Sequence, residues 1–275
     1  MPESLDNVLG AQRERLNRFG SDECVDVHCH CLPGLDDGPA TAAEAMALCR
    51  ALAADGITTV IATPHELGRY DGNGQAAEIR RAVSRLNAAL AAEGVPLNVL
   101  PGADVRLDER IPALLAAGRL LTLADRGKYL LVELPHEVLI DLRPLIEELA
   151  LRRVKVILSH PERHMLLVSQ VHAVMPWLQA GAVLQITAAS LLGEFGSAAG
   201  RAAWYWLRVG AATLVATDAH DTVGRGPRMS EAFDLVTDRL GRAFARRVCI
   251  ENPLCVRYGQ DITLGMAPVR QGGWV

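Results

Sequence analysis

Seven short apolar segments recur along this chain, and stretches with helical periodicity separate most of them. Each segment holds only a few residues, and most of them lack the polar alternation of a half-exposed strand. The segments begin at Val25, Ile57, Leu97, Tyr129, Val154, Ala182 and Thr213. Continuous apolar strands that alternate with helices are typical of a parallel sheet covered on both faces. We therefore expect an α/β fold in which seven strands close, or nearly close, into a barrel.

Caps and periodicity predict helices between these strands. Thr41 and Glu44 have the spacing of a capping box, and Gly56 is a suitable end for the helix that they begin. The apolar face of a second helix is formed by Ile79, Val83, Leu86 and Leu90. Further helices are expected over 142–153, over 198–209 and from Ser230 onward. No Pro- or Ser-rich linker divides the chain, so residues 24–260 are expected to form one domain.

Residues 1–23 and 261–275 are expected to lie outside this domain, as an N-terminal extension and a C-terminal tail. Within 5–19 the apolar residues have roughly helical spacing, which predicts a short amphipathic helix. Its apolar face could pack on the barrel or on a second copy of the chain, which would make a homo-oligomer. The sequence leaves both arrangements open.

Composition argues against two classes of protein. The 275 residues carry a net charge of −4 and the pI is about 6.1, a balance that argues against a general nucleic-acid binder. No apolar run reaches the length of a membrane span, and the first residues lack the pattern of a signal peptide. We expect a cytoplasmic protein without direct membrane insertion.

The six cysteines show no paired CxxC spacing, which makes a structural zinc finger a poor fit. In a reducing cytoplasm they are expected to be small packing residues or free thiols. Cys29 and Cys31 alternate with His28 and His30, so their side chains should point to the opposite side of the strand.

Histidines and carboxylates lie at or just beyond the ends of six of the seven predicted strands. The sixth strand alone contributes no such residue. The candidates are His28, His30, Asp37, His65, Asp104, Glu133, His160, Asp218 and His220. In β/α barrels the C-terminal ends of the strands form the active site, so these side chains are predicted to meet there.

Neutral imidazoles and carboxylates suit divalent ions such as Mn²⁺, Fe²⁺ and Zn²⁺. Nine candidate ligands are more than one ion needs, which indicates a cluster of two or three ions. Such clusters hold a bridging hydroxide, stabilise both the attacking and the leaving oxygen, and suit the hydrolysis of phosphate esters.

Arg163 and Arg225 lie in two of the loops that carry these ligands. A guanidinium group can bind two phosphoryl oxygens at once, so both arginines are predicted to be catalytic residues that hold phosphate. Taken alone, each arginine would be read as a solvated surface charge. His136 and His164 are candidate proton donors, and the alternative for each is an ordinary loop or helix-surface histidine.

The ordered motifs resemble those of the polymerase and histidinol phosphatase (PHP) superfamily. More narrowly, HCHCLPGLDDGPAT, GADV, LSHPERH, ATDAH and GRGPRMSEAFDLV look like the manganese-dependent tyrosine-protein phosphatases of bacterial capsule and exopolysaccharide operons. The resemblance implies a distorted seven-stranded PHP-type barrel and Mn²⁺ as the favoured metal, with Fe, Zn and Mg as alternatives. It also implies a phosphotyrosine protein as substrate, namely the tail of a bacterial tyrosine kinase.

The resemblance further implies a division of the ligands among three ions. The first set would be His28, His30, Asp104 and Asp218; the second Glu133, His160 and the shared Asp104; the third Asp37, His65 and His220. Two features depart from the family. Asp104 stands where relatives usually have a bridging Glu, and 27 residues precede His28, whereas relatives tend to begin almost at that motif.

Three other functions compete with this interpretation. A second PHP esterase, such as a histidinol phosphatase, would use the same ligands on a small molecule. A metal amidohydrolase also opens with HxH, but it expects eight strands and often a carboxylated lysine, whereas Lys128 and Lys155 lie at strand starts. A kinase-binding scaffold with weak catalysis would follow if Asp104 had cost the chain its turnover. The sequence argues against a cysteine-based phosphatase, because no Cys is followed six positions later by Arg.

Overall fold

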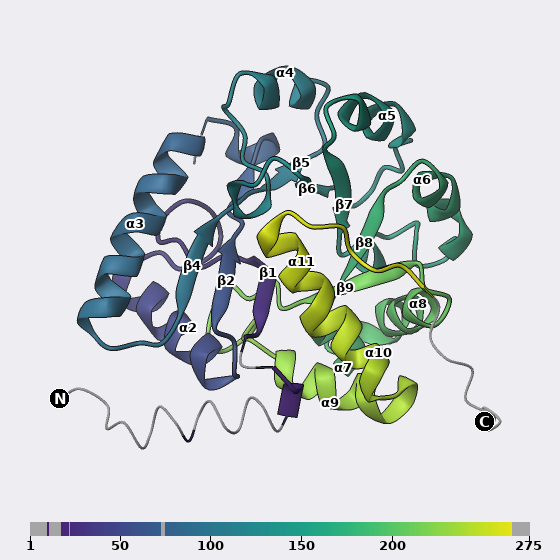
Figure 1. Cartoon of the computed structure of the whole chain (residues 1–275). Helices are drawn as coiled ribbons and strands as arrows, with labels where there is room; N and C mark the ends of the chain where they lie inside the picture. Colours follow the sequence, from purple (N-terminus) through teal and green to yellow (C-terminus); the bar gives the residue numbers. More distant parts are fainter. Residues whose placement is uncertain (1–9, 11–17, 22, 73–74, 266–275) are drawn as a thin grey trace.

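Two sheets of parallel strands form the centre of the molecule, and helices surround them (Figure 1). The computed structural model describes residue 10 and residues 18–21, 23–72 and 75–265. One sheet has the order β1 (Val25–Cys29), β2 (Thr59–Ala62), β4 (Asn98–Pro101). The other has the order β3 (His65–Glu66), β5 (Asp104–Arg106), β6 (Tyr129–Glu133), β7 (Lys155–Ser159), β8 (Val183–Thr187), β9 (Ala212–Ala216).

The two sheets meet where two chain segments are interrupted. β3 follows β2 after Thr63 and Pro64, and β5 follows β4 after Gly102 and Ala103. Pro64 has no N–H to donate to a ladder, but its carbonyl accepts a hydrogen bond from the Asp104 N–H at 3.1 Å. An added Cβ at Gly102 would lie 2.7 Å from Ile61 Cγ2, so the close approach requires glycine. Each of the seven predicted segments contains a strand, and these interruptions add β3 and β5.

The first and last strands also lie side by side. The Asp218 N–H donates to the His28 carbonyl at 2.8 Å, and the His30 N–H donates to the Ala219 carbonyl at 2.9 Å. With the β3–β5 pairing on the other side, the strands surround a common interior.

Each of the five helices predicted within residues 24–260 is present, and five shorter helices had not been predicted. They are α2 (Ala42–Ala54), α3 (Ala76–Ala92), α4 (Ile111–Ala116), α5 (Arg143–Leu151), α6 (Met175–Gln179), α7 (Ala188–Leu192), α8 (Gly196–Arg208), α9 (Met229–Leu240), α10 (Arg242–Arg246) and α11 (Asn252–Tyr258). Short turns of helix are η1 (Gly68–Tyr70), η2 (Leu123–Asp125), η3 (Pro161–Arg163), η4 (Val171–Val174) and the π-helical η5 (Arg247–Glu251). The capping box is present: the Glu44 N–H donates to Thr41 Oγ1 at 3.2 Å, and the Glu44 carboxylate accepts from the Thr41 N–H.

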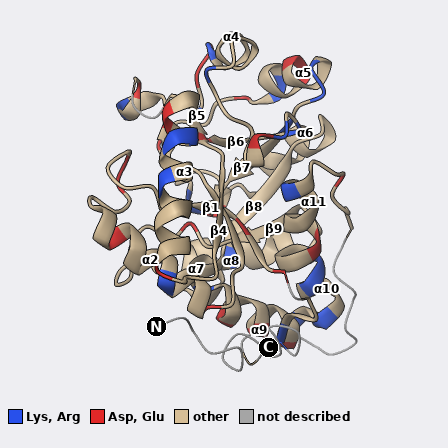
Figure 2. Cartoon of the chain, turned by 60° about the vertical axis from the view of Figure 1, so that its left-hand side comes forward, with Lys and Arg blue, Asp and Glu red and all other residues tan. Residues whose placement is uncertain are grey.

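Most of the helix predicted over 5–19 lies outside the described residues, as do residues 266–275 of the tail. Phe19 is described and buried, and its ring packs edge-on against Phe233 of α9 with centroids 5.1 Å apart. No helix in the described part of the chain is long and apolar enough to cross a membrane. In the view of Figure 2, acidic and basic residues are interspersed over the helices.

The interior of the ring is apolar at the end where the strands begin. Val25, Tyr129 and Val183 belong to one buried cluster there, and Val256 of α11 packs with them. Figure 1 shows α11 lying across the ring of strands. The Tyr129 hydroxyl donates to the Gln260 carbonyl at 2.8 Å, which fastens the segment after α11 to the same end. The interior is therefore closed at the end where the strands begin, and the polar residues gather at the other end.

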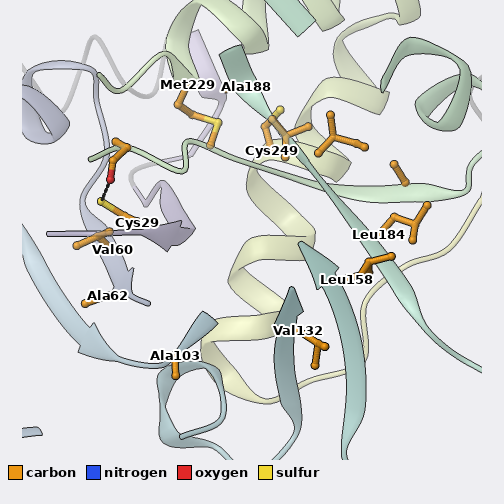
Figure 3. Packing of buried hydrophobic residues seen from close by; sticks show 14 of the residues in the cluster. Cys29, Val60, Ala62, Ala103, Val132, Leu158, Leu184, Ala188, Met229 and Cys249 are labelled. Carbon is orange, nitrogen blue, oxygen red and sulfur yellow. Dashed lines mark hydrogen bonds between the residues drawn. The ribbon is translucent and has the colours of Figure 1, made fainter. Parts of the chain in front are cut away.

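Cys29 lies in the apolar cluster between strands and helices (Figure 3), and Cys31 belongs to the same cluster, on the side that the alternation predicts. Cys29 Sγ is 3.4 Å from the Ala219 carbonyl oxygen, its hydrogen-bond acceptor. The described cysteines are all free thiols, and burial raises the pKa of Cys29 to about 11. These thiols act as packing groups, because a buried neutral thiol is a small apolar side chain.

Changing both Cys29 and Cys31 to Ser is expected to lower the midpoint of thermal unfolding but to leave bound metal unchanged. Each buried hydroxyl without a full set of partners costs about 1–3 kcal/mol, and neither side chain faces the histidines. Calorimetry and metal analysis would check this, with the partly exposed Cys255→Ser as the matched control. Loss of an ion from the double variant would mean that the thiols belong to the metal-binding residues.

Candidate metal centre

The nine predicted ligands come together at the C-terminal end of the strands. Their places are His28 in β1, His30 and Asp37 after it, His65 in β3, Asp104 in β5, Glu133 at the end of β6, His160 after β7, and Asp218 and His220 after β9. Seven of the nine are buried, while His65 and Asp37 are partly exposed, with side chains 15% and 36% accessible. The site therefore lies at the floor of an opening and not on the outer surface.

The centre of the group is formed by three side chains whose polar atoms nearly touch. His28 Nε2 lies 3.1 Å from His30 Nε2, and the two nitrogens lie 3.2 and 3.3 Å from Asp218 Oδ1. His28 Nε2 is also 3.7 Å from Asp104 Oδ2, which in turn is 3.4 Å from His65 Nδ1. A chain of close donor atoms thus runs from β1 to β3 across the opening.

Hydrogen bonds on the far side of three rings fix which nitrogen faces this centre. His28 Nδ1 bonds Gln185 Oε1 at 2.8 Å, His30 Nδ1 bonds Asp36 Oδ2 at 2.6 Å, and His220 Nδ1 bonds the Asp218 carbonyl at 2.9 Å. Each partner oxygen accepts, so each Nδ1 carries a proton and each Nε2 is the nitrogen directed at the centre. Metal-binding histidines are typically oriented in this way.

A cation would satisfy atoms that otherwise have no partner. Both carboxylate oxygens of Asp104, Asp218 Oδ1 and His220 Nε2 are buried and form no hydrogen bond among the described residues. An unpaired buried polar atom costs about 1–3 kcal/mol. Because all these atoms are electron-pair donors of the types that bind divalent ions, the residues fit a metal cluster.

Four overlapping groups of side chains have ligand atoms within 4.8 Å of one another. The groups are His30, Asp37, His65, His220; then His28, His30, Asp104; then His28, His160, Asp218; and then His65, Asp104, Glu133. The first contains the whole third set that the family resemblance implies. The second set is divided differently, because His160 groups with His28 and Asp218 while Glu133 groups with His65 and Asp104.

The surroundings favour the neutral form of His160 and His220 but the charged form of His30. Burial and the positive charge of Arg163 hold the pKa of His160 well below its usual value, and burial with His30 lowers the pKa of His220 to about 4. Burial also lowers the pKa of His30, but Asp36 and Asp218 outweigh it and raise that pKa to about 10. A bound cation would replace the proton on His30 Nε2, because Asp218 stabilises a positive charge at that place in either case.

Arg163 and Arg225 both bond the outer oxygen of Asp218. Arg225 Nη2 lies 2.7 Å from Asp218 Oδ2, and Arg163 Nη1 donates to the same oxygen. The Arg163 guanidinium also lies over the Phe195 ring, 4.4 Å from its centroid. The two predicted phosphate-binding arginines thus lie next to each other, and Asp218 connects them to His28 and His30.

A cavity of about 400 Å³ opens above the ligands. Its lining includes Asp37, His65, Leu67, Gly68, Arg69, Tyr70, Arg106, Glu133, His136, His160, Arg163 and Arg225. Four of these side chains are arginines, and the opening is therefore suited to an anion.

The two candidate proton donors have different surroundings. His136 lines the cavity, and its Nε2 is 3.5 Å from Glu133 Oε1. His164 is buried; its Nε2 donates to the Val138 carbonyl at 3.2 Å, and its Nδ1 accepts from the Leu166 N–H at 3.2 Å. Both ring nitrogens of His164 are occupied by backbone groups, so it holds two loops together and is not placed to donate a proton to substrate.

Three residues with roles at this site had not been predicted. Gln185 comes from β8, the sixth predicted strand, and orients His28. Asp36 orients His30 and also accepts the His65 N–H at 3.0 Å. Arg106 Nη1 lies 2.8 Å from Glu133 Oε2. Two signals were available in the sequence, namely a polar Gln in an apolar strand and the first Asp of the LDDG turn, whereas none pointed to Arg106.

Changing Arg163 or Arg225 to Ala is expected to lower kcat/KM for aryl phosphates without emptying the metal positions. A lost charged contact is worth about 1.5–3 kcal/mol, or roughly 10- to 150-fold. Steady-state kinetics and metal analysis would check this, with Arg80→Ala as the control because Arg80 pairs with the surface residue Asp125. Wild-type kinetics in both variants would mean that neither arginine touches the substrate.

Comparison with known proteins finds a matching family model and named relatives. A family model for capsular polysaccharide synthesis, CpsB/CapC, matches residues 24–257. The tyrosine-protein phosphatase YwqE of Bacillus subtilis is 35% identical over 221 residues, which cover 79% of this chain and 85% of YwqE.

Two solved structures match the fold of this chain, one closely and one distantly. One, from work on YwqE of Bacillus subtilis and CpsB of Streptococcus pneumoniae, described as unique metal-dependent tyrosine phosphatases, matches with a TM-score of 0.84 and 31% identity, covering 90% of this chain and 100% of that one. A β-aspartyl dipeptidase from Fervidobacterium islandicum, at a TM-score of 0.51 and 14% identity over 85% of this chain and 72% of its own, shares the fold alone. Because the family model spans nearly all of the described chain and a relative is more than one-third identical, this protein belongs to the CpsB/CapC family of capsular polysaccharide synthesis.

Proposed function

We propose that this chain is a metal-dependent tyrosine-protein phosphatase, a hydrolase that acts in the control of capsule or exopolysaccharide synthesis. The observation that carries the proposal is the cluster of His28, His30 and Asp218, whose polar atoms lie 3.1 to 3.3 Å apart, with Asp218 bonded by Arg163 and Arg225 of the cavity lining. A phosphate ester needs cations on its oxygens as charge develops, and this arrangement provides for them. Relatives named as tyrosine phosphatases support the same reaction.

Several finer points belong to the proposal. We propose two or three bound ions, Mn²⁺ above Fe, Zn or Mg, held by the nine ligands named above. The substrate is a phosphotyrosine protein, with the tail of a bacterial tyrosine kinase as the specific candidate, in the cytoplasm and without nucleic acid or membrane insertion. We also propose that residues 1–23 form an N-terminal extension, residues 24–260 the phosphatase domain and residues 261–275 a C-terminal tail. A homo-oligomer formed through residues 1–23 is part of the same hypothesis. We further propose a seven-stranded PHP-type barrel, which is supported by counting β2–β3 and β4–β5 as one interrupted strand each.

The chain's own residues would each have a defined task. Divalent ions bound here would polarise the phosphoryl oxygens and lower the pKa of an attacking water. Arg163 and Arg225 would bind the phosphoryl oxygens, and Asp218 would hold both guanidinium groups in place. A tyrosine phenolate, whose conjugate acid has a pKa near 10, leaves more easily than a serine alkoxide. The site therefore needs no strong acid to release it.

The amidohydrolase alternative is not supported by the lysines. The sequence has only two, Lys128 and Lys155, and both pair with Asp261, at 3.0 and 2.8 Å. They lie where β6 and β7 begin, at the end of the barrel opposite the candidate site. No lysine is available to bridge ions as a carbamate.

The test is hydrolysis of p-nitrophenyl phosphate and of a phosphotyrosine peptide by the metal-free chain, titrated separately with Mn²⁺, Fe²⁺, Zn²⁺ and Mg²⁺. We expect activity only with bound metal, loss of activity with chelator, and preference for the phosphotyrosine peptide over a phosphoserine peptide of the same sequence. Undiminished activity in a preparation that metal analysis finds empty would contradict the proposal. A preference for histidinol phosphate would favour the small-molecule phosphatase, and binding of phosphopeptide without turnover would favour the scaffold.

A further inference from the structure

Two more arginines line the same cavity and contact different carboxylates. Arg69 Nη2 lies 3.3 Å from Asp37 Oδ2, and Arg106 Nη1 lies 2.8 Å from Glu133 Oε2. The Arg69 side chain is 71% exposed and that of Arg106 is 31% exposed, so both reach the mouth of the cavity. Arg163 and Arg225, by contrast, share Asp218.

The backbone places these two arginines beside each other. Gly68 approaches the stem of Arg106 so closely that an added Cβ would lie 3.0 Å from Arg106 Cγ. Gly68 has φ +57, and the preceding Leu67 is buried with φ +67, so the segment is held in a conformation that few residues adopt. Tyr70 completes this wall: its ring stacks on His65 at 5.4 Å, and the Arg69 guanidinium lies 4.6 Å from its centroid.

The charges of the cavity leave these arginines under-compensated once metal is bound. Four arginines line the cavity, whereas the carboxylates that they contact are three: Asp37, Glu133 and Asp218. All three are candidate ligands, so their negative charge would be shared with divalent ions. A single phosphotyrosine brings about −1.5 to −2 charges, and these are taken up by the ions together with Arg163 and Arg225. A second anion on the substrate chain would neutralise the positive charge of Arg69 and Arg106.

We propose that Arg69 and Arg106 form an anion subsite, which selects chains that carry a second negative group next to the reacting phosphotyrosine. That group is a carboxylate side chain or a neighbouring phosphotyrosine, since both offer paired oxygens to a guanidinium fork. The inference rests on the proposed phosphatase function and adds its substrate preference.

The test compares peptides of one length in which the phosphotyrosine is flanked by Gln, by Glu or by a second phosphotyrosine. For the metal-loaded wild-type chain we expect kcat/KM to be about 5- to 20-fold higher with either anionic flank than with Gln, an effect that weakens in high salt. In the double variant R69Q/R106Q this ratio should fall below about twofold, because neutral side chains have no charge to offer the flank. Arg143→Gln, an exposed arginine paired with Asp141, is the control and should keep the wild-type ratio.

Binding of the same three peptides, made with a non-hydrolysable phosphonate in place of the reacting phosphate, is measured by fluorescence anisotropy and does not depend on turnover. Equal affinity of the wild-type chain for all three, or a preference that survives in R69Q/R106Q, would overturn the anion subsite. If p-nitrophenyl phosphate is not hydrolysed with any metal while the anionic peptides still bind more tightly, the phosphatase function fails and the subsite stands. If only the double phosphotyrosine is preferred, the second anion is a phosphate and not a carboxylate.

Discussion

Asp218→Asn is expected to lower kcat/KM for p-nitrophenyl phosphate by roughly 150- to 5,000-fold, because removing one partner of a buried charged group costs about 3–5 kcal/mol. The Asp218 carboxylate contacts the metal-binding and the phosphate-binding residues at once. Its Oδ1 lies close to His28 and His30, and its Oδ2 accepts hydrogen bonds from Arg163 and Arg225. The amide has the same size but no charge. At least one ion per chain should also be lost.

The choice of Asn is dictated by the backbone. Asp218 has φ +53, a conformation that Asn tolerates and most other residues do not. Asp125 provides the matched control, since it has φ +54, is partly exposed and pairs with Arg80 on the surface. Asp125→Asn should retain wild-type kinetics and metal content. Full metal occupancy with near-normal turnover in Asp218→Asn would remove this residue from the centre.

Asp104→Asn should weaken the binding of more than one ion. Its carboxylate is fully buried, has no hydrogen-bond partner in the described part of the chain, and belongs to two groups of candidate ligands. Neighbouring histidines hold its pKa below the usual value despite burial, as expected for an anion at the centre of several donors. Neither Asp104 oxygen accepts a backbone N–H of a described residue, so this carboxylate does not serve as a cap for the following turn.

Asp104→Glu introduces the residue that the family resemblance implies at this position and serves as the comparison. It should keep the full number of ions, because the charge is preserved and only one methylene is added. Metal titration of the Asn and Glu variants beside the wild type, with kcat/KM for an aryl phosphate, separates the two effects. Equal and complete occupancy in all three chains would show that Asp104 binds no ion.

The convergence of nine side chains could be predicted because parallel strands bring their C-terminal ends to one edge. Thr41 with Glu44 and the apolar face of α3 were equally accessible, since caps and periodicity are local. The interruptions after β2 and β4 were not predicted. They depend on how closely Gly102 approaches Ile61, and that is a tertiary contact.

The surroundings of the ligands were also beyond the sequence. Gln185 is separated by 157 residues from the histidine that it orients, and no local pattern connects the two. Arg106 follows Asp104 closely in the chain, but its pairing with Glu133 depends on the register of β5 against β6. The division of ligands among ions is a further case, since overlapping groups form only when all strands are in place.

The closure between β1 and β9 has a consequence for how this protein reaches its native state. Cys29 and Ala219 touch across 190 residues of chain, so two candidate ligands from the start of the sequence meet two from near its end. A chain still being synthesised holds His28 and His30 without Asp218 and His220, and it cannot assemble the central group. Bringing such distant segments together costs entropy that grows only slowly with length. An ion bound by ligands from β1 and from the segment after β9 would stabilise the contact between them. Metal binding and the completion of folding would then be a single event.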